Sequence, residues 1–325
     1  MKKAIITGLY GQDGSYLFER LSELNYDIFG IVKEPLSLNS YNNKNIISKN
    51  NNPKVYSINL YDCDALKKFI YDIKPDEIYH LAASHFSSQD NLESKNYLDK
   101  QLFDNNVKAT SNILYSCLEI APKARIVLAG SCLMFDNTKS NIQNELTPFE
   151  SNSLYGLSKI AEYYLANYYR NNGLHVSMAI LYNHESSRRS INFVTKKIIS
   201  NMIAIKNRQI INFSLGNINS KKDWGYAKDY VNGMYLMAQQ EFPDDYILSS
   251  GKLNSIKDII DICADYLGIS DWEKFITIEP GIITRSISSQ LLGDPNKANQ
   301  KLGWNNSVSF KELIELMIKD ELDKD

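Results

Sequence analysis

Tyr155 and Lys159 stand four positions apart and carry side chains that could together exchange a proton with a substrate oxygen. The surrounding segment, YGLSKIAEYYLANYYRNN, has a helical pattern, and a spacing of four places both side chains on one helical face. A phenol has an ordinary pKa of about 10, so a nearby ammonium is needed to favour the phenolate near neutral pH. A Tyr and a Lys at this spacing are also common on exposed helices, so the pair needs further support.

Ser131 supplies part of that support, because it ends a predicted strand, RIVLAGS, upstream of the pair. Its hydroxyl is placed to hydrogen-bond a reacting hydroxyl or carbonyl group. The chemistry indicated is reversible hydride transfer, in which Tyr155 exchanges the proton, Lys159 tunes it and holds the cofactor ribose, and Ser131 orients the substrate. We predict these three residues as the catalytic group.

A glycine-rich turn near the amino terminus is the predicted cofactor site. Gly8, Gly11 and Gly14 stand in TGLYGQDGSYL, directly after the strand pattern AIIT and before a helical pattern. A dinucleotide pyrophosphate needs a turn without side chains, followed by a helix amino terminus whose N–H groups and dipole hold the anion. A turn selected for tight packing is the alternative. We predict that the three glycines, with Gln12 and Asp13, bind the cofactor.

The end of the second predicted strand bears on the choice between NAD and NADP. There GIVKEPL places Lys33 and Glu34 where the adenosine ribose should lie. A cation favours a 2′-phosphate and a carboxylate favours a 2′-hydroxyl, so both cofactors stay open. Five further residues are predicted to border the adenine or the path of the dinucleotide: Asn59, Leu60, Leu81, Ala82 and Ala83.

These residues need a scaffold of alternating strands and helices, and the first half of the sequence has that alternation. Short runs such as AIIT, DIFGIV, EIYHLAA and RIVLAG are separated by amphipathic stretches, which is typical of βαβ units. We predict an α/β fold, with a Rossmann-type doubly wound parallel sheet and a smaller mixed α/β substrate-binding lobe. The dinucleotide-binding domain is placed at 1–182, and the substrate lobe at 183–325, from which the chain could return to the first domain.

Composition excludes several classes of partner. The chain of 325 residues has 36 Lys and Arg against 38 Asp and Glu, so its net charge of -2 provides no broad attractive field for nucleic acid. Its four cysteines contain no CxxC pair, which indicates neither a disulfide framework nor a metal site. No signal peptide or membrane span is evident, so we expect a protein of the reducing cytoplasm.

Longer segments carry a more specific resemblance. They are TGLYGQDGSYL, EIYHLAAS, LYNHESSRR, NFVTKKI, LGNINSKKDWGYAKDYV and LLGDPNKANQKLGW. Through them the chain resembles the GDP-mannose 4,6-dehydratases, which are extended short-chain dehydrogenases/reductases, over nearly its full length. The resemblance implies a GDP-linked sugar as substrate, a homodimer or homotetramer, and a role in the synthesis of surface-polysaccharide precursors.

The resemblance also implies positions for the nucleotide sugar. Asn183 follows the sixth strand, Val194 and Lys197 would lie at the guanine, and Arg285 would lie near the diphosphate. Lys222 stands where the family usually has an arginine. A lysine neutralises phosphate as a point charge but lacks the bidentate fork of arginine, which predicts weaker or re-oriented binding.

One departure from the family bears directly on the reaction. Where the family has Ser or Thr, then Ser, then Glu, this chain has Ser131, Cys132 and Leu133. In a 4,6-dehydratase that Glu is the acid/base for eliminating water across C5 and C6 of the oxidised sugar, and leucine has no proton to exchange. His85 and Cys132 are candidate replacements that would face the substrate. His80 and His175 are expected to be packed or surface residues, and His184 to orient its loop.

The sequence therefore predicts hydride transfer at C4 of a GDP-linked hexose or heptose, either oxidation of the C4 hydroxyl or reduction of a 4-keto sugar. Two alternatives stay open. One is a true 4,6-dehydratase that uses a substitute acid/base. The other is a catalytically reduced paralogue that binds GDP-sugar and cofactor, against which the presence of Ser131, Tyr155 and Lys159 argues.

Overall fold

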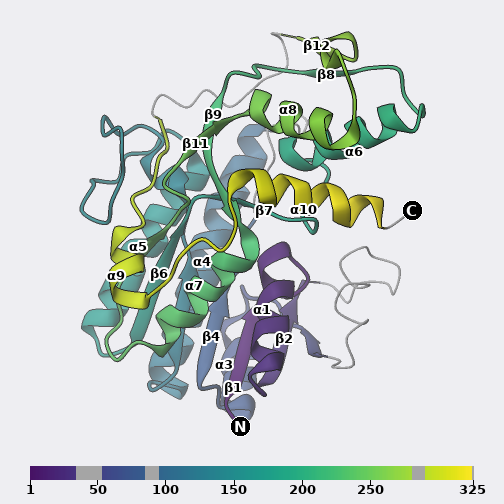
Figure 1. Ribbon diagram of the computed structural model, residues 1–325. Helices are drawn as coiled ribbons and strands as arrows, with labels where there is room; N and C mark the ends of the chain where they lie inside the picture. Colours follow the sequence, from purple (N-terminus) through teal and green to yellow (C-terminus); the bar gives the residue numbers. More distant parts are fainter. Residues whose placement is uncertain (34–52, 85–94, 280–289, 324–325) are drawn as a thin grey trace.

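One large parallel sheet forms the centre of the molecule (Figure 1). The computed structural model describes residues 1–33, 53–84, 95–279 and 290–323, with the backbone alone for 95–100. Neighbouring strands of the sheet are parallel and follow the order β10-β6-β5-β4-β1-β2-β3. The strands are β1 (Lys3–Thr7), β2 (Asp27–Val32), β3 (Lys54–Ser57), β4 (Glu77–His80), β5 (Arg125–Ala129), β6 (His175–Leu181) and β10 (Tyr246–Leu248).

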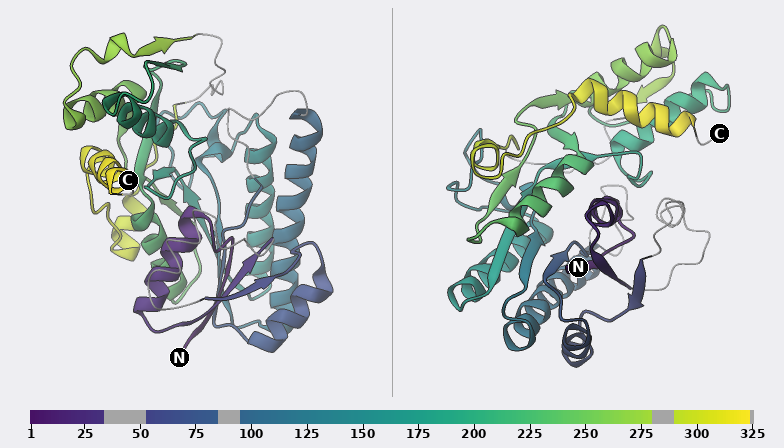
Figure 2. Two further views of the ribbon diagram at one scale, coloured as in Figure 1. Left: turned by 90° about the vertical axis from the view of Figure 1, so that its right-hand side faces the viewer. Right: turned by 60° about the horizontal axis from the view of Figure 1, so that its bottom comes forward.

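Helices cover both faces of this sheet (Figure 2). On one face α1 (Gln12–Glu23) packs against α7 (Ala227–Gln239). On the other face α3 (Cys63–Ile73), α4 (Lys95–Ile120) and α5 (Leu154–Asn171) lie in a row, in which α4 contacts both neighbours. A sheet covered on both faces needs strands that are apolar throughout, and this explains the continuous apolar runs of β1, β5 and β6.

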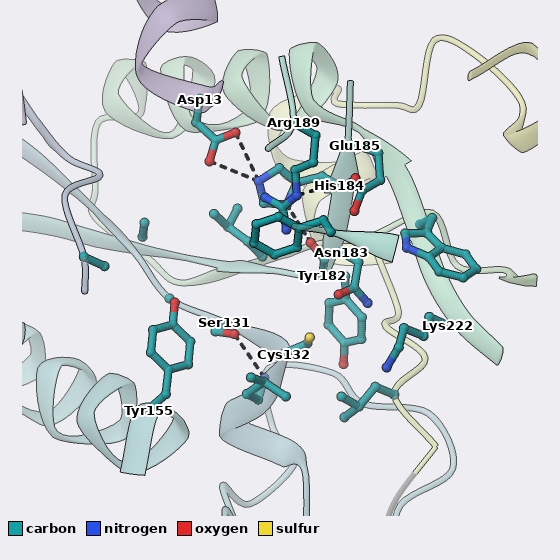
Figure 3. A pocket seen from close by; sticks show the side chains of 18 of the residues that line it. Asp13, Ser131, Cys132, Tyr155, Tyr182, Asn183, His184, Glu185, Arg189 and Lys222 are labelled. Atoms are coloured by element: carbon teal, nitrogen blue, oxygen red, sulfur yellow. Dashed lines mark hydrogen bonds and ion pairs between the residues drawn. The ribbon is translucent and has the colours of Figure 1, made fainter. Parts of the chain in front are cut away.

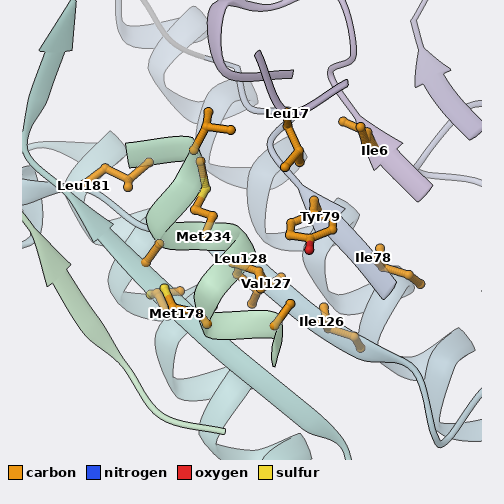
Figure 4. Packing of buried hydrophobic residues seen from close by; sticks show 14 of the residues in the cluster. Ile6, Leu17, Ile78, Tyr79, Ile126, Val127, Leu128, Met178, Leu181 and Met234 are labelled. Atoms are coloured by element: carbon orange, nitrogen blue, oxygen red, sulfur yellow. The ribbon is translucent and has the colours of Figure 1, made fainter. Parts of the chain in front are cut away.

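The core between α1, α7 and the sheet is a single apolar cluster (Figure 4). Leu17 of α1 and Met234 of α7 are fully buried against residues of the central strands, including Tyr79 of β4 and Leu128 of β5. Because every central strand contributes side chains to this cluster, its packing fixes the positions of the loops at the strand ends.

A smaller lobe lies beyond the carboxyl ends of the central strands. Its core contains Ile198, Ile259 and Ile314, one from each of its three main helices. Its elements are β7 (Asn183–Glu185), α6 (Val194–Lys206), β8 (Phe213–Leu215), β9 (Lys221–Tyr226), β11 (Leu253–Ser255), α8 (Ile256–Leu267), η3 (Trp272–Lys274), β12 (Ile276–Ile278) and α10 (Phe310–Leu322). Strands β11, β9 and β7 form one small sheet, and β12 and β8 form another.

The predicted fold class, an α/β fold with a Rossmann-type parallel sheet and a smaller mixed lobe, is confirmed. Strand β10, which follows residue 182 in the sequence, pairs with β6 in the large sheet, and α9 (Asn296–Leu302) packs against β10. The division of the chain at residue 182 stays a prediction. Among the described residues, no helix combines the length and the apolar character that a membrane span requires.

Candidate active site

A cavity of about 380 Å³ lies at the carboxyl ends of the central strands, between the large sheet and the smaller lobe. The strand order reverses between β1 and β4, and open α/β sheets bind their ligands outside the strand ends at such a switch point. Figure 3 shows the cavity with Tyr155 and Ser131 on one side and Asp13, His184 and Arg189 on the other.

The glycine turn after β1 allows close backbone approach. Gly8 has a φ of +73°, and a Cβ there would lie 3.0 Å from the amide nitrogen of Ala82. A Cβ on Gly14 would lie 2.3 Å from the carbonyl oxygen of Gly8. Gly11 is the N-cap of α1 and provides no side-chain cap for the first N–H groups of the helix. The turn thus forms a cradle that fits a pyrophosphate at a helix amino terminus.

Thr7, the last residue of β1, fixes the neighbouring strand exit. Its Oγ1 accepts hydrogen bonds from the amides of Leu81 and Ala82 at 3.1 and 3.0 Å. Its own hydrogen is then donated to Nδ1 of His80, at 2.8 Å, so Nδ1 is an acceptor. Burial lowers the pKa of His80 to about 3, and the ring is neutral. His80 is therefore a packed residue, as predicted.

Ser131 and the start of α5 are held together by a short helical turn. Ser131 caps η2 (Cys132–Phe135), and its Oγ accepts a hydrogen bond from the amide of Leu133 at 3.2 Å. A Cβ on Gly156 would lie 2.3 Å from the carbonyl oxygen of Leu133. Because position 156 has no side chain, the first turn of α5 lies directly on η2, and this contact brings Tyr155 to the same cavity as Ser131.

Tyr155 and Lys159 share the predicted face of α5 and both line the cavity. The Lys159 ammonium lies 5.8 Å from the centre of the Tyr155 ring. Burial raises the pKa of Tyr155, and the Lys159 ammonium opposes that rise. Burial alone would lower the pKa of Lys159, but the carboxylate of Glu162 raises it above its usual value. The phenol therefore faces a lysine that stays charged.

The opposite wall contains a partly buried ion pair that joins the two lobes. Nε2 of His184 lies 3.1 and 3.0 Å from the carboxylate oxygens of Asp13, and Nδ1 lies 2.7 Å from the carbonyl oxygen of Tyr182. Both ring nitrogens thus face acceptors, which requires the imidazolium form. Burial alone would lower the pKa of His184, but Asp13 raises it. Ser186 donates to Gln12 at 2.8 Å and extends this connection.

The two residues after Ser131 provide little acid/base chemistry. Burial raises the pKa of the Cys132 thiol to about 12, so it stays protonated near neutral pH. Leu133 lines the cavity with an apolar side chain. Glu185 is a buried carboxyl group in the cavity wall, but Figure 3 places it across the cavity from Tyr155.

Most of the predicted site residues in the described part of the chain line this cavity. They are Asp13, Leu81, Ala83, Ser131, Cys132, Leu133, Tyr155, Lys159, Asn183, Val194 and Lys222. The glycines, Gln12 and Ala82 lie in the adjoining turn and strand exit. Lys197 is in the first turns of α6, with its ammonium 3.4 Å from the carbonyl oxygen of Ser214.

The predicted adenine end is less enclosed. Lys33 is exposed after β2, and its carbonyl accepts a hydrogen bond from Ser57. Asn59 is exposed, and the carbonyl of Leu60 accepts a hydrogen bond from Asn112. Three residues considered from the sequence, Glu34, His85 and Arg285, lie outside the described residues.

Sequence reasoning missed several polar and aromatic groups of the cavity. Arg189 lies 3.5 Å from Glu185 and above the ring of Phe193. Glu162 forms an ion pair with Lys159. Its position one helical turn after that lysine is the sequence feature that could have indicated this contact. Tyr182 and Trp224 also line the site. Nothing in the local pattern distinguishes these two aromatic residues from ordinary core residues.

Comparison with known proteins places the chain in a family. The model of the GDP-mannose 4,6 dehydratase family matches residues 5–317. GDP-mannose 4,6 dehydratase 1 of Arabidopsis thaliana is 34% identical over 99% of this chain and 90% of its own length. The human GDP-mannose 4,6 dehydratase is 31% identical over 98% of this chain and 91% of its own length.

Solved structures share the fold at lower identity. A UDP-glucose 4-epimerase of Thermotoga maritima, solved with UDP-glucose, is 18% identical with a TM-score of 0.83 and covers 99% of both chains. A dTDP-glucose 4,6-dehydratase of Bacillus anthracis, solved with NAD, is 16% identical with a TM-score of 0.82 over 99% of this chain and 97% of its own. On the full-length match of sequence and model, the chain belongs to the GDP-mannose 4,6 dehydratase family.

Proposed function

We propose that this chain is an NAD(P)-dependent enzyme that transfers a hydride at C4 of a GDP-linked hexose or heptose without removing water. The observation that carries the proposal is the composition of one cavity wall. Ser131, Tyr155 and Lys159 line the cavity together, whereas the position two residues after Ser131 is the apolar Leu133. These three residues form the proposed redox group, and Leu133 stands where the family resemblance implies the proton carrier for dehydration.

Each residue of the group has a defined role in this reaction. Tyr155 takes the proton of the C4 hydroxyl during oxidation, or returns it to a 4-keto oxygen during reduction. Lys159 stays charged, favours the phenolate and hydrogen-bonds the cofactor ribose. The Ser131 hydroxyl orients the sugar oxygen. When bound, the nicotinamide cofactor supplies or accepts the hydride.

The glycine cradle supports a dinucleotide cofactor in this position. Gly8 and Gly14 leave no room for side chains, and α1 begins at Gln12 with no side-chain cap. We propose both NAD and NADP as candidate cofactors, with Lys33 beside the ribose.

The far side of the cavity would hold the nucleotide sugar. Asn183, Val194 and Lys222 line it, with Trp224 beside them. Lys222 would neutralise diphosphate as a point charge, and Lys197 would lie near the guanine, as the family resemblance implies. We place the protein in the cytoplasm, in agreement with its four cysteines, all of which are thiols.

The second candidate function is that of an authentic 4,6-dehydratase with a substitute acid/base. Among the described residues, Cys132 is a poor candidate because its pKa is raised to about 12. Glu185 is a stronger one, since its buried Oε2 accepts no hydrogen bond, but it lies across the cavity from Tyr155 (Figure 3). This position favours contact with the sugar over proton transfer beside Ser131.

The test is the mass of the product. Purified protein is mixed with GDP-mannose and oxidised cofactor, and the nucleotide sugar is followed by mass spectrometry. We expect a product that has lost two hydrogens and kept its water, and Tyr155→Phe should lower its rate at least about 100-fold. Tyr71→Phe, on the exposed face of α3, is the matched control. A product that has also lost water would establish the authentic 4,6-dehydratase, and an unchanged sugar with the wild type would indicate the catalytically reduced paralogue. Full activity of Tyr155→Phe would show that Tyr155 does not carry the proton.

We also propose a homodimer formed through α4 and α5. Tyr164 and Tyr168 of α5 are 62% and 61% exposed, and Tyr115 of α4 and Leu157 of α5 are each 40% exposed. Tyr164 and Tyr168 lie one turn apart, and α4 and α5 pack side by side (Figure 2). Aromatic residues gathered on paired helices are typical of subunit interfaces, and a two-fold axis would bury the same face of both subunits.

A further inference from the structure

Glu162 is a buried acid whose function the reaction above leaves unexplained. It lies on α5 one turn after Lys159, and only 1% of its surface is exposed. Its Oε2 accepts hydrogen bonds from the Lys159 ammonium at 3.1 Å and from the Thr110 hydroxyl at 3.0 Å. Its Oε1 is equally buried and has no hydrogen-bond partner. Burying a carboxylate with an unsatisfied oxygen is costly, so a purely structural side chain would do better as an amide or an apolar residue.

The charges around this carboxylate give it an electrostatic effect on the cofactor site. Burial raises the pKa of Glu162, and the Lys159 ammonium opposes that rise together with the uncharged Thr110 hydroxyl from α4. His80 of β4, the titratable group that faces Lys159 from the sheet, is neutral because burial keeps its pKa near 3. Tyr155 is a neutral phenol in this state. The lysine and the glutamate therefore form a buried pair with no net charge.

The oxidation state of a nicotinamide changes its charge, because the oxidised ring is a cation and the reduced ring is neutral. A lone Lys159 ammonium would repel the oxidised ring and leave the reduced ring almost unaffected. A carboxylate behind the lysine offsets that repulsion, and a low-dielectric interior makes the offset large.

We propose that Glu162 is a positioning residue that biases the bound cofactor toward its oxidised form, by balancing the charge of Lys159 beside the nicotinamide. The inference rests on the proposed cofactor site. It implies that the protein binds the oxidised cofactor more tightly than the reduced one, which favours oxidation of the sugar as the first step and exchange of the reduced cofactor afterwards.

The test compares the affinities of the two cofactor forms in Glu162→Gln. Glutamine keeps the volume and the hydrogen bonds but removes the charge. At an effective dielectric of about 20 and a separation of about 10 Å, one unit charge changes a dissociation constant about tenfold. We expect the ratio of the Kd for oxidised cofactor to the Kd for reduced cofactor to rise about tenfold, measured by nicotinamide fluorescence and by competition with the oxidised form.

Two further variants separate charge from structure. Thr110→Val removes the other hydrogen bond to Oε2 and keeps the charge, so the ratio should stay at the wild-type value. Glu119→Gln removes an exposed carboxylate of α4 that pairs with Lys67, and it should also leave the ratio unchanged. Equal weakening of both cofactor forms in Glu162→Gln would show a structural role and overturn the inference, and so would an unchanged ratio.

Glu162→Leu keeps the inference testable if Glu162→Gln fails to fold. It removes the same charge and leaves no buried carboxylate oxygen without a hydrogen bond, so the ratio should again rise about tenfold. An unchanged or decreased ratio would overturn the inference. Failure of the proposed function is a distinct result, because a wild-type protein without a cofactor site would bind neither form.

Discussion

Leu133 lies in the cavity wall two residues after Ser131, and its side chain carries no proton that can be exchanged. The neighbouring thiol of Cys132 does not take over this function, because burial raises its pKa to about 12. At the scale of single residues, the wall thus combines a phenol and an ammonium with an apolar side chain at the position where the family resemblance implies a carboxyl group.

A glutamate at this position should restore part of the missing chemistry. Leu133→Glu places a carboxyl group beside Ser131, and we expect it to produce a 4-keto sugar that has lost water, at a rate at least about tenfold above that of the wild type. The measurement is the mass of the nucleotide sugar over time. Leu133→Gln has the same shape without the acid and should stay at the background rate. Equal dehydration by both variants, or by neither, would show that position 133 does not control the outcome.

At the scale of elements, the pair between Asp13 and His184 connects the start of α1 to β7 across the two lobes. The stability that this pair provides changes with pH in a direction set by the pKa shift of His184. Burial alone would lower the pKa of His184, but Asp13 raises it in the folded state. The stabilisation is therefore complete below the ordinary histidine pKa of about 6.5 and is lost as the pH rises through the folded-state value.

We expect His184→Asn to lower the free energy of unfolding by about 2 kcal/mol near pH 6, because it leaves the partly buried Asp13 carboxylate without its charged partner. The difference from the wild type should shrink as the pH rises above about 6.5 and through the folded-state pKa of His184. Urea unfolding at several pH values measures it. The control is His175→Asn. Burial lowers the pKa of His175, so its contribution to the free energy of unfolding has the opposite pH trend. A difference for His184→Asn that stays constant with pH would contradict the imidazolium assignment.

Local patterns in the sequence predicted some of these elements and not others. The turn after β1, the strand that ends at Ser131, and the helix with Tyr155 and Lys159 each follow from a short pattern with a fixed period. The contact between Asp13 and His184 joins residues 171 positions apart, so it depends on how the lobes pack. The positioning role proposed for Glu162 could not be predicted either, because a glutamate on a helix is usually solvated.

At the scale of the whole molecule, His80 makes the free energy of unfolding decrease at acidic pH. Its folded-state pKa is lowered to about 3 by burial, against an ordinary value of about 6.5. His80 therefore binds a proton in the unfolded chain but not in the folded chain, and stability is lost as the pH falls below about 6.5. This loss reaches about 3 kcal/mol at pH 4.

Comparison of the wild type with His80→Asn isolates this contribution. Asparagine can still accept the hydrogen bond from Thr7 but takes up no proton in this range. We expect the variant to be less stable near neutral pH and to lose about 3 kcal/mol less than the wild type between about pH 7 and 4, by urea unfolding. Parallel pH curves for the two proteins would show that His80 is not neutral in the fold.

The assembly of two subunits is the other property of the whole molecule. Tyr164→Glu and Tyr168→Glu place charges on the exposed face of α5, and burial of such charges at an interface should convert the proposed dimer to a monomer. Sedimentation velocity measures the change. Phe242→Glu is the control, because Phe242 is 74% exposed in the turn after α7 and lies outside the proposed interface. An unchanged sedimentation coefficient for both α5 variants would rule out this face.

The central claim is hydride transfer at C4 without loss of water, and a deuterium label at that carbon tests it most directly. A GDP-hexose with deuterium at C4 is incubated with oxidised cofactor, and both products are examined by NMR. We predict deuterium on the nicotinamide ring, an oxidised sugar that keeps its C6 oxygen, and no transfer with Tyr155→Phe. A dehydratase would return the hydride to the sugar, because its overall reaction is redox-neutral. Deuterium recovered at C6 of a sugar that has lost water would therefore contradict this account.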